Sequence, residues 1–211
     1  MRTSELINAL VEDDTAAPRL DVRLGVAVLA GTALAGALFF LLIGFRPDIA
    51  QALETVRFPY KFLITLSLAV AATGVVLRLA RPGVPAARWG FALFLPLVLL
   101  ALGVAAELLA TSASSWGARL VGSNSMNCVT VIPFLSIGPL ACLLLALRQG
   151  APTRPGLAGA VAGLAASGIA ATFYASNCTD DSPLFVATWY PIATAMVVVV
   201  GYLIGTRALR W

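Results

Sequence analysis

Six apolar runs that contain no charged residue dominate this sequence and limit what it can fold into. At about 1.5 Å per helical residue, runs of this length cross most or all of the roughly 30 Å hydrocarbon core of a bilayer. A chain inside that core has to satisfy its backbone hydrogen bonds internally, so each run is predicted to form a helix. The sequence therefore predicts an all-α, polytopic integral membrane protein with six transmembrane helices. The runs are Leu24–Gly44, Phe62–Leu77, Trp89–Ala106, Val129–Leu147, Leu157–Phe173 and Leu184–Ile204.

The distribution of Lys and Arg predicts how the chain is oriented. Of its 211 residues only 11% are charged, against about a quarter in soluble domains, and 14 are Lys or Arg. If both termini lie on one side, only Arg46, Arg57, Lys61 and Arg119 lie on the other. Cytoplasmic loops carry the excess of positive charge, so both termini of the multi-pass protein are predicted to be cytoplasmic. The net charge of +4 reflects this topology, and no direct nucleic-acid binding is expected.

Residues 1–22 are predicted to form a cytoplasmic amphipathic segment, separate from the transmembrane domain at 23–211. Thr3 and Ser4 are good helix N-caps, and apolar residues then recur at helical spacing. Helices that lie on anionic membranes usually carry Lys and Arg, whereas this one ends in acids. A protein partner is therefore at least as good an explanation as the bilayer surface or the underside of the bundle. The residues predicted to make the contact are Leu6, Ile7, Leu10, Val11, Glu12, Asp13 and Asp14.

The predicted topology sorts the three cysteines by depth. Cys128 begins the fourth span from the outer side, and Cys178 lies in the outer loop before the sixth. Cys142 is about 21 Å deeper along the fourth helix, so it is predicted to be a small buried apolar residue that cannot reach the other two. Cys128 and Cys178 face the oxidising compartment, where thiols pair or react. Three interpretations stay open: two independent thiols, a structural disulfide, or a redox- or metal-responsive pair.

Three carboxylates are predicted to lie on the same outer face as these thiols. A nearby carboxylate raises the pKa of a thiol and also attracts cations. Two thiolates with oxygen ligands suit a soft or borderline divalent metal, and in the absence of His such a site is weak and open. Cys128, Cys178, Asp180, Asp181 and Glu107 are therefore the candidate ligands of a transiently bound metal ion, and no resident cofactor is required.

Several classes of function are disfavoured by what the sequence lacks. It contains no His, no P-loop, no dinucleotide fingerprint and no Cys-x-x-Cys, so an enzyme is not expected. No ionisable residue lies near the middle of a predicted span, which argues against transport. A membrane thiol-disulfide oxidoreductase and a small-solute transporter remain the alternatives. Small residues four apart, at 156–168 and 201–205, predict close helix packing within the bundle, with a homodimer as the minor alternative.

Four stretches, "MRTSELINALVEDD", "LRQGAPTRPGLAGAVAGLAA", "NCTDDSPLFVATWY" and "GTRALRW", resemble the NrsF-type membrane proteins, the negative regulators of sigma F, in order and over essentially the whole chain. The resemblance implies an inner-membrane anti-sigma factor that holds an extracytoplasmic-function sigma factor inactive at the cytoplasmic face and releases it under stress. It also implies that Cys128 and Cys178 respond to heavy metals or oxidative conditions, and that the N-terminal segment binds the sigma factor. Members often carry His before the second cysteine, where this chain has Asn177, which favours thiol chemistry over metal ligation.

Overall fold

The computed structural model describes residues 20–81 and 87–210, and every regular element in these two ranges is helical. Six long helices are apolar enough to cross a membrane, with mean hydropathies from 1.6 to 2.4. The predicted all-α, multi-pass fold is therefore confirmed. The long helices are α2 (Leu20–Leu42), α4 (Arg57–Leu79), α6 (Phe94–Ala110), α8 (Ser125–Leu147), α9 (Pro155–Ala175) and α10 (Pro183–Ala208). The short ones are α3 (Ile49–Leu53), α5 (Ala87–Gly90), a 3-10 turn at Phe91–Leu93 and α7 (Ala113–Val121).

The long helices extend beyond the charge-free runs, so the predicted span ends were wrong. The second helix begins at Arg57 and therefore includes Lys61, and the third continues past Glu107 to Ala110. The first begins at Leu20, inside the segment predicted to precede it. Charged side chains are compatible with the end of a spanning helix when they reach water or pair with one another. The sites described below show that Lys61 and Glu107 are paired.

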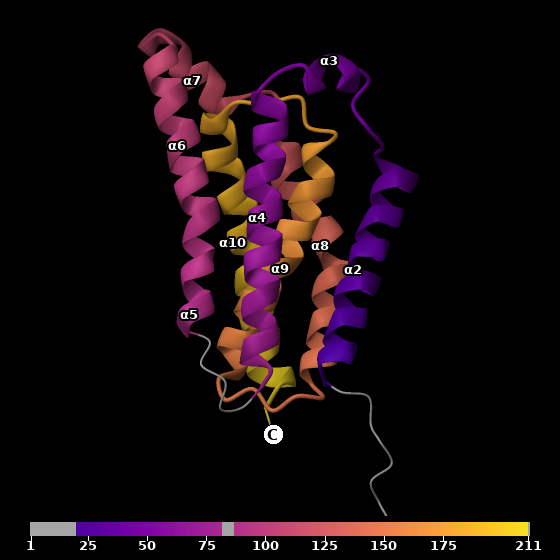
Figure 1. Cartoon of the computed structure of the whole chain (residues 1–211). Helices are drawn as coiled ribbons and strands as arrows, with labels where there is room; N and C mark the ends of the chain where they lie inside the picture. Colours follow the sequence, from indigo (N-terminus) through magenta and orange to yellow (C-terminus); the bar gives the residue numbers. More distant parts are fainter. Residues whose placement is uncertain (1–19, 82–86, 211) are drawn as a thin grey trace, which may run out of the picture.

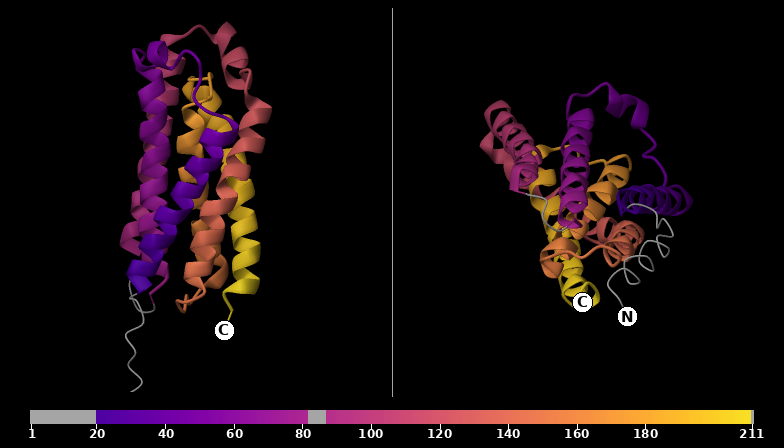
Figure 2. Two further views of the ribbon diagram at one scale, coloured as in Figure 1. Left: turned by 90° about the vertical axis from the view of Figure 1, so that its right-hand side faces the viewer. Right: turned by 60° about the horizontal axis from the view of Figure 1, so that its bottom comes forward.

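Helix α9 lies at the centre of the bundle, in contact with α10, α4 and α8 (Figures 1 and 2). In its most apolar stretch 67% of the residues are buried, compared with 17% for α6. Helices α2 and α6 lie on opposite sides of the bundle, and α2 packs mainly against α8 (Figures 1 and 2). Most of the apolar surface of α2 and α6 is thus left for lipid.

Small residues allow α9 and α10 to approach at backbone distance. A Cβ added at Gly159 would lie 2.9 Å from the Gly205 Cα and would collide with the carbonyl oxygen of Gly201. A Cβ added at Gly163 would lie 2.6 Å from the carbonyl oxygen of Val197. The stripe of small residues predicted from the sequence therefore lies inside the bundle, in the contact between α9 and α10, where small residues allow close helix packing.

The start of α2 and the end of α10 lie at one end of the bundle, and Cys128 and Cys178 lie at the other. Helix α2 starts and α10 finishes at the same end, drawn at the bottom of Figure 1. The opposite end, which we call the cysteine end, holds the connections at residues 43–56, 111–124 and 176–182. Which end faces the cytoplasm remains a prediction from the positions of Lys and Arg.

Candidate functional site

Cys128 and Cys178 meet at the cysteine end. Cys128 lies in the first turn of α8, and the N–H of Cys178 donates to the Tyr174 carbonyl oxygen at 3.0 Å, just beyond the end of α9. Both are free thiols, both are completely buried, and they lie within hydrogen-bonding reach of each other. Cys178 was expected in an exposed loop, but the 176–182 connection folds inward over the bundle. Cys142 is only partly buried and packs in a different cluster, away from the pair.

Lys61 and Arg46 hold the backbone of Cys178 from two other elements. The Lys61 Nζ, on the first turns of α4, donates to the Cys178 carbonyl oxygen at 2.9 Å and lies 2.5 Å from Asp181 Oδ1. Arg46, just after α2, donates through Nη1 to the same carbonyl oxygen at 3.3 Å and to Asp181 Oδ2 at 2.7 Å. Lys61 is only 1% exposed. Burying a charge is costly unless it is paired and hydrogen-bonded, so this cluster is expected to be rigid.

Phe58 and Asp48 complete the surroundings of these two cations. The Phe58 ring is buried, with the Arg46 guanidinium 5.6 Å and the Lys61 ammonium 5.5 Å from its centre. Such contacts favour cations over the face of an aromatic ring. Asp48 receives two parallel hydrogen bonds from Arg46, each 2.7 Å long, and this contact lowers the pKa of the Asp48 carboxyl. We call Arg46, Lys61 and Asp181 the charged clamp.

Asp180 joins the two segments that carry the cysteines. Its Oδ2 accepts from the backbone N–H groups of Ser123 at 2.9 Å and of Asn124 at 2.8 Å, just before α8 begins. Although burial opposes ionisation, the hydrogen bonds from Asn124 and Ser123 hold the pKa of Asp180 below its ordinary value. Gly122 has a φ of +59°, which favours glycine, and a Cβ there would collide with Phe185 and Asp180. The turn before Cys128 therefore requires both Gly122 and Asp180.

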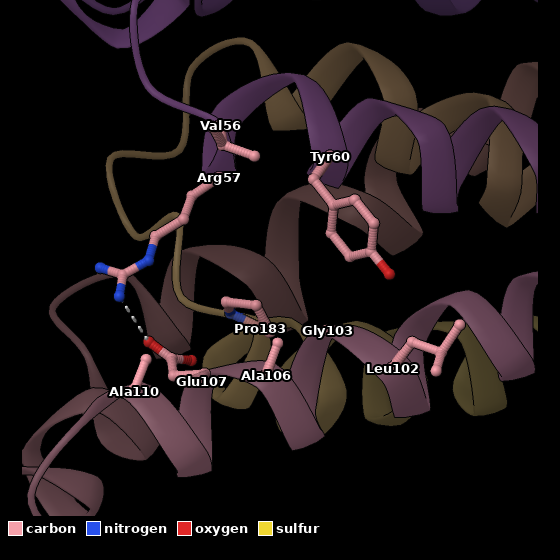
Figure 3. A pocket seen from close by; sticks show the side chains of 9 residues that line it. All are labelled: Val56, Arg57, Tyr60, Leu102, Gly103, Ala106, Glu107, Ala110 and Pro183. Carbon is pink, nitrogen blue, oxygen red and sulfur yellow. Dashed lines mark ion pairs between the residues drawn. The ribbon is translucent and has the colours of Figure 1, made fainter.

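Glu107 belongs to a second cluster rather than to the thiols. It is 4% exposed, and it accepts from Arg119 at 3.1 Å, from the Ser182 hydroxyl at 2.6 Å and from the Leu184 N–H at 3.1 Å. It thus satisfies the N-terminus of α10, where a carboxylate is favoured by the helix dipole. Arg57 approaches the same carboxylate at 3.6 Å beside a cavity of about 420 Å³ between α4 and α6, where Arg57 and Tyr60 lie on the α4 wall and Glu107 on the α6 wall (Figure 3).

Cys128 and Lys61 together change the acidity expected for Cys178. The sequence predicted that neighbouring carboxylates would raise the pKa of the thiol, and the charge of Asp180 does act in that direction, but other groups outweigh it. A hydrogen bond from Cys128, together with the positive charge of Lys61, outweighs burial and Asp180 and lowers the pKa of Cys178 to about 7. The thiolate is the nucleophile and the metal ligand, so Cys178 is the more reactive of the pair in this respect. Tyr174 lies in the same buried cluster as the two cysteines, and within the described residues its hydroxyl has no hydrogen-bond partner.

The predicted metal ligands all lie at the cysteine end, but each of the three carboxylates binds a different partner within the protein. Asp181 pairs with Arg46 and Lys61, Asp180 with the turn before α8, and Glu107 with α10. Among the residues that the structure describes, no group of three or more His, Cys, Asp or Glu is arranged to hold a metal ion. Metal capture therefore remains a prediction that rests on the two thiols. The predicted sigma-binding residues, at positions 6–14, lie outside the described residues.

Sequence reasoning missed Lys61 and Arg46, which it counted only as topology markers. They approach Cys178 over separations of 117 and 132 residues, so no local motif connects them. A signal was present in the charge pattern, since the four cations assigned to the outer side are accompanied there by five acids, Asp48, Glu54, Glu107, Asp180 and Asp181. Such balanced charge beside the spans indicates ion pairs rather than topology alone.

The fold and the site together define a polytopic helical membrane protein with two free thiols buried under a charged clamp at one end. The family described as NrsF, negative regulator of sigma F, matches residues 10–211, and the chain belongs to this family. The chain is 32% identical to the probable anti-sigma-F factor NrsF of Azospira oryzae and 33% identical to the anti-sigma-F factor NrsF of Caulobacter vibrioides, with 100% of both chains covered in each case. No solved structure matches significantly. Membership of a family of negative regulators confirms that the chain is not an enzyme.

Proposed function

We propose that this protein is an anti-sigma factor of the bacterial inner membrane that holds an extracytoplasmic-function sigma factor at the cytoplasmic face. The family match and the full-length similarity to two anti-sigma-F factors support this role. The N-terminal segment, residues 1–22, is the proposed binding element, with the apolar stripe of Leu6, Ile7, Leu10 and Val11 entering a groove of the sigma factor and the acids at 12–14 beside it.

The observation that carries the sensory part of the proposal is the pair of free thiols under the charged clamp. Cys128 and Cys178 lie in one buried cluster, and the pKa of Cys178 is lowered to about 7, which favours the thiolate near neutral pH. Oxidation would form a disulfide, and a soft metal ion such as cadmium would bind both sulfurs. Either event pulls together the start of α8 and the end of α9 and changes the geometry of the Cys178 carbonyl that Lys61 and Arg46 hold.

Helix α2 is the proposed connection between the cysteine end and the N-terminal segment. The backbone N–H of Arg46 donates to the Ser176 carbonyl oxygen at 3.2 Å, and the Asn177 side chain donates to the Gly44 carbonyl oxygen at 3.1 Å. The end of α2 is thus tied to the cysteine loop at two points beyond the charged clamp. Because α2 begins at Leu20, within the last residues of the proposed binding segment, a shift at Gly44 and Arg46 can reach the opposite end through a single helix.

The size of the effect is consistent with a switch that one disulfide only partly drives. A disulfide contributes about 2–4 kcal/mol, and only its differential effect on two states counts. Moving an equilibrium from 1:99 to 99:1 takes about 5.5 kcal/mol. Rearrangement of the charged clamp is the second contribution that we propose, since its ion pairs are buried and sensitive to geometry.

Co-purification and a sigma-dependent reporter test the proposal. Deletion of residues 1–19 is expected to abolish capture of the sigma factor, and capture that survives the deletion contradicts the binding segment. A double Cys128→Ser, Cys178→Ser variant is expected to bind the sigma factor but to keep the reporter silent under cadmium or chromate. Cys142→Ser is the matched control and should respond like the parent. Full derepression in the double variant would exclude the thiols as the sensor.

A further inference from the structure

A cavity of about 490 Å³ lies between α4, α6, α9 and α10, and three of the residues that line it, Ala171, Val186 and Tyr190, belong to the buried cluster that contains Cys128 and Cys178. Its volume is in the range of small-molecule sites. Leu97 and Ala195 line it and are exposed, so it opens between the helices toward the lipid. Thr65 and Tyr190 line it as well, and its inner walls are formed by apolar residues of α9 and α10.

Tyr190 connects this cavity to the cysteines. It is 5% exposed, and in the described part of the chain its hydroxyl has no hydrogen-bond partner. Its ring lies 6.3 Å from that of Tyr174, and Tyr190 belongs to the same buried cluster as Cys128 and Cys178. A buried hydroxyl without a partner is unfavourable, so this group is available for a ligand that accepts a hydrogen bond.

The lining determines the chemistry of the occupant. It contains no charged side chain, so it does not complement the phosphate of a phospholipid headgroup. The complementary molecule is uncharged, mostly apolar, and carries an acceptor oxygen within reach of Tyr190. Two thiols belong to the same buried cluster as Tyr190, and forming a disulfide from them takes a two-electron oxidant. An occupant that is such an oxidant could therefore react with them. A quinone dissolved in the membrane has all of these properties.

We propose that the cavity binds the ring of a membrane quinone, that Tyr190 donates to one of its carbonyl oxygens, and that the quinone oxidises Cys128 and Cys178. The two S–H bonds break and one S–S bond forms, which releases two electrons and two protons. The quinone takes up both and leaves as the quinol. The reaction occurs once for each reduced protein molecule, so the chain reports the redox state of the quinone pool without acting as an enzyme. The inference rests on the proposed role of the thiol pair as the sensor.

Anaerobic oxidation of the purified full-length protein in phosphatidylcholine nanodiscs tests this inference. The reduced protein is mixed with a short-tailed ubiquinone, whose fully substituted ring cannot alkylate thiols, and quinone absorbance is followed together with the mass of the maleimide-labelled protein. We expect loss of the label from Cys128 and Cys178, retention at Cys142 and one quinol formed per protein. Tyr190→Phe should slow the reaction about three- to ten-fold. Ala195→Phe, which fills the mouth of the cavity from its exposed edge, should slow it further.

Tyr202→Phe is the matched control, because Tyr202 lies on the same helix with 49% of its surface exposed and should leave the rate unchanged. No oxidation by the quinone, or oxidation at the parent rate in both cavity variants, overturns the inference. The assay contains no sigma factor, so its result is independent of the proposed anti-sigma role. If the double cysteine variant fails to respond in cells while the quinone has no effect here, only the quinone inference is lost.

Discussion

The side-chain nitrogen of Lys61 lies 2.9 Å from the backbone carbonyl oxygen of Cys178, across 117 residues of sequence. The contact is made to the backbone and not to the thiol, so a change in the oxidation state of the sulfur does not remove the acceptor of this hydrogen bond. What oxidation can alter is the orientation of that carbonyl. Through its bond to Lys61, a movement of the Cys178 carbonyl can therefore alter the positions of α4, of the end of α2 and of the loop between α9 and α10.

Replacing Lys61 by Met should raise the pKa of Cys178 and destabilise the fold. The substitution removes the positive charge that favours the thiolate and leaves Asp181 with Arg46 alone. Breaking a buried ion pair costs about 3–5 kcal/mol, and the remaining pair with Arg46 puts the expected loss near 3 kcal/mol. Detergent-induced unfolding and the rate of iodoacetamide labelling measure the two effects. Arg57→Met is the control, since Arg57 is 44% exposed and 3.6 Å from its carboxylate; equal losses in both variants contradict the role given to Lys61.

The pH dependence of Cys178 follows from its lowered pKa. Labelling of Cys178 is expected to rise with a midpoint near pH 7 instead of 9.0. A thiol whose pKa is lowered by folding adds stability that is complete above its unfolded pKa and is lost as the pH falls through about 7. The parent should therefore be more stable at pH 9 than at pH 6.5, by at most about 2.7 kcal/mol. Unfolding of the parent and of Cys178→Ser at both pH values tests this, and an equal pH effect in the two proteins refutes it.

Asn177→Ala should separate thiol chemistry from signalling. The variant loses the hydrogen bond to the Gly44 carbonyl oxygen, which ties the cysteine loop to the end of α2. One such bond contributes about 1 kcal/mol, so the protein should fold and its thiols should oxidise at nearly the parent rate. Release of the sigma factor under oxidation should fall, as read from the reporter. Asn127→Ala removes the Asn that precedes the other cysteine but bonds only within its own helix start, and it should signal normally.

Gly159→Val should disrupt the contact between α9 and α10. The added side chain meets the backbone of Gly201 and Gly205, which has no room to move, so we expect a loss of about 3 kcal/mol or more. Gly25→Ala is the matched control, because a Cβ at Gly25 meets no atom within 4 Å. That variant should be neutral or slightly stabilised, as a helical Gly→Ala change usually is. Thermal unfolding in detergent compares the two, and similar midpoints would contradict the packing described here.

Hydropathy predicted the six spans because a segment that crosses lipid has to be apolar and helical, and this holds for every one of them. The same rule misplaced the ends, since charged residues were taken as boundaries, whereas Lys61 and Glu107 lie within helices and are neutralised by partners. Counting depth along the helices selected Cys128 as the partner of Cys178 and set Cys142 apart, and the structure places the three in that way. The depth of a residue in the membrane follows from its position along its own helix, so the sequence alone is enough to predict it.

The charged clamp was not predictable in this way, because it depends on which helices are neighbours. Arg46 follows the first span, Lys61 begins the second, and Asp181 precedes the sixth. Nothing in the local sequence of any of them specifies the other two. The burial of Cys178 was missed for the same reason: a polar loop of seven residues reads as solvent-exposed until the residues that hold it inward are known.

The position of α9 has a consequence for how the protein is made. It is the least apolar of the six candidate spans, with a mean hydropathy of 1.6, and the one with the largest buried share. Its closest neighbour, α10, is synthesised after it and also brings Tyr190 to the thiols, while Asp181 lies immediately before α10. During insertion, the glycine-rich face of α9 therefore stays uncovered until α10 has entered the membrane. The thiol site is consequently completed only when the last helix has been inserted, so a nascent or truncated chain carries both cysteines without their finished surroundings.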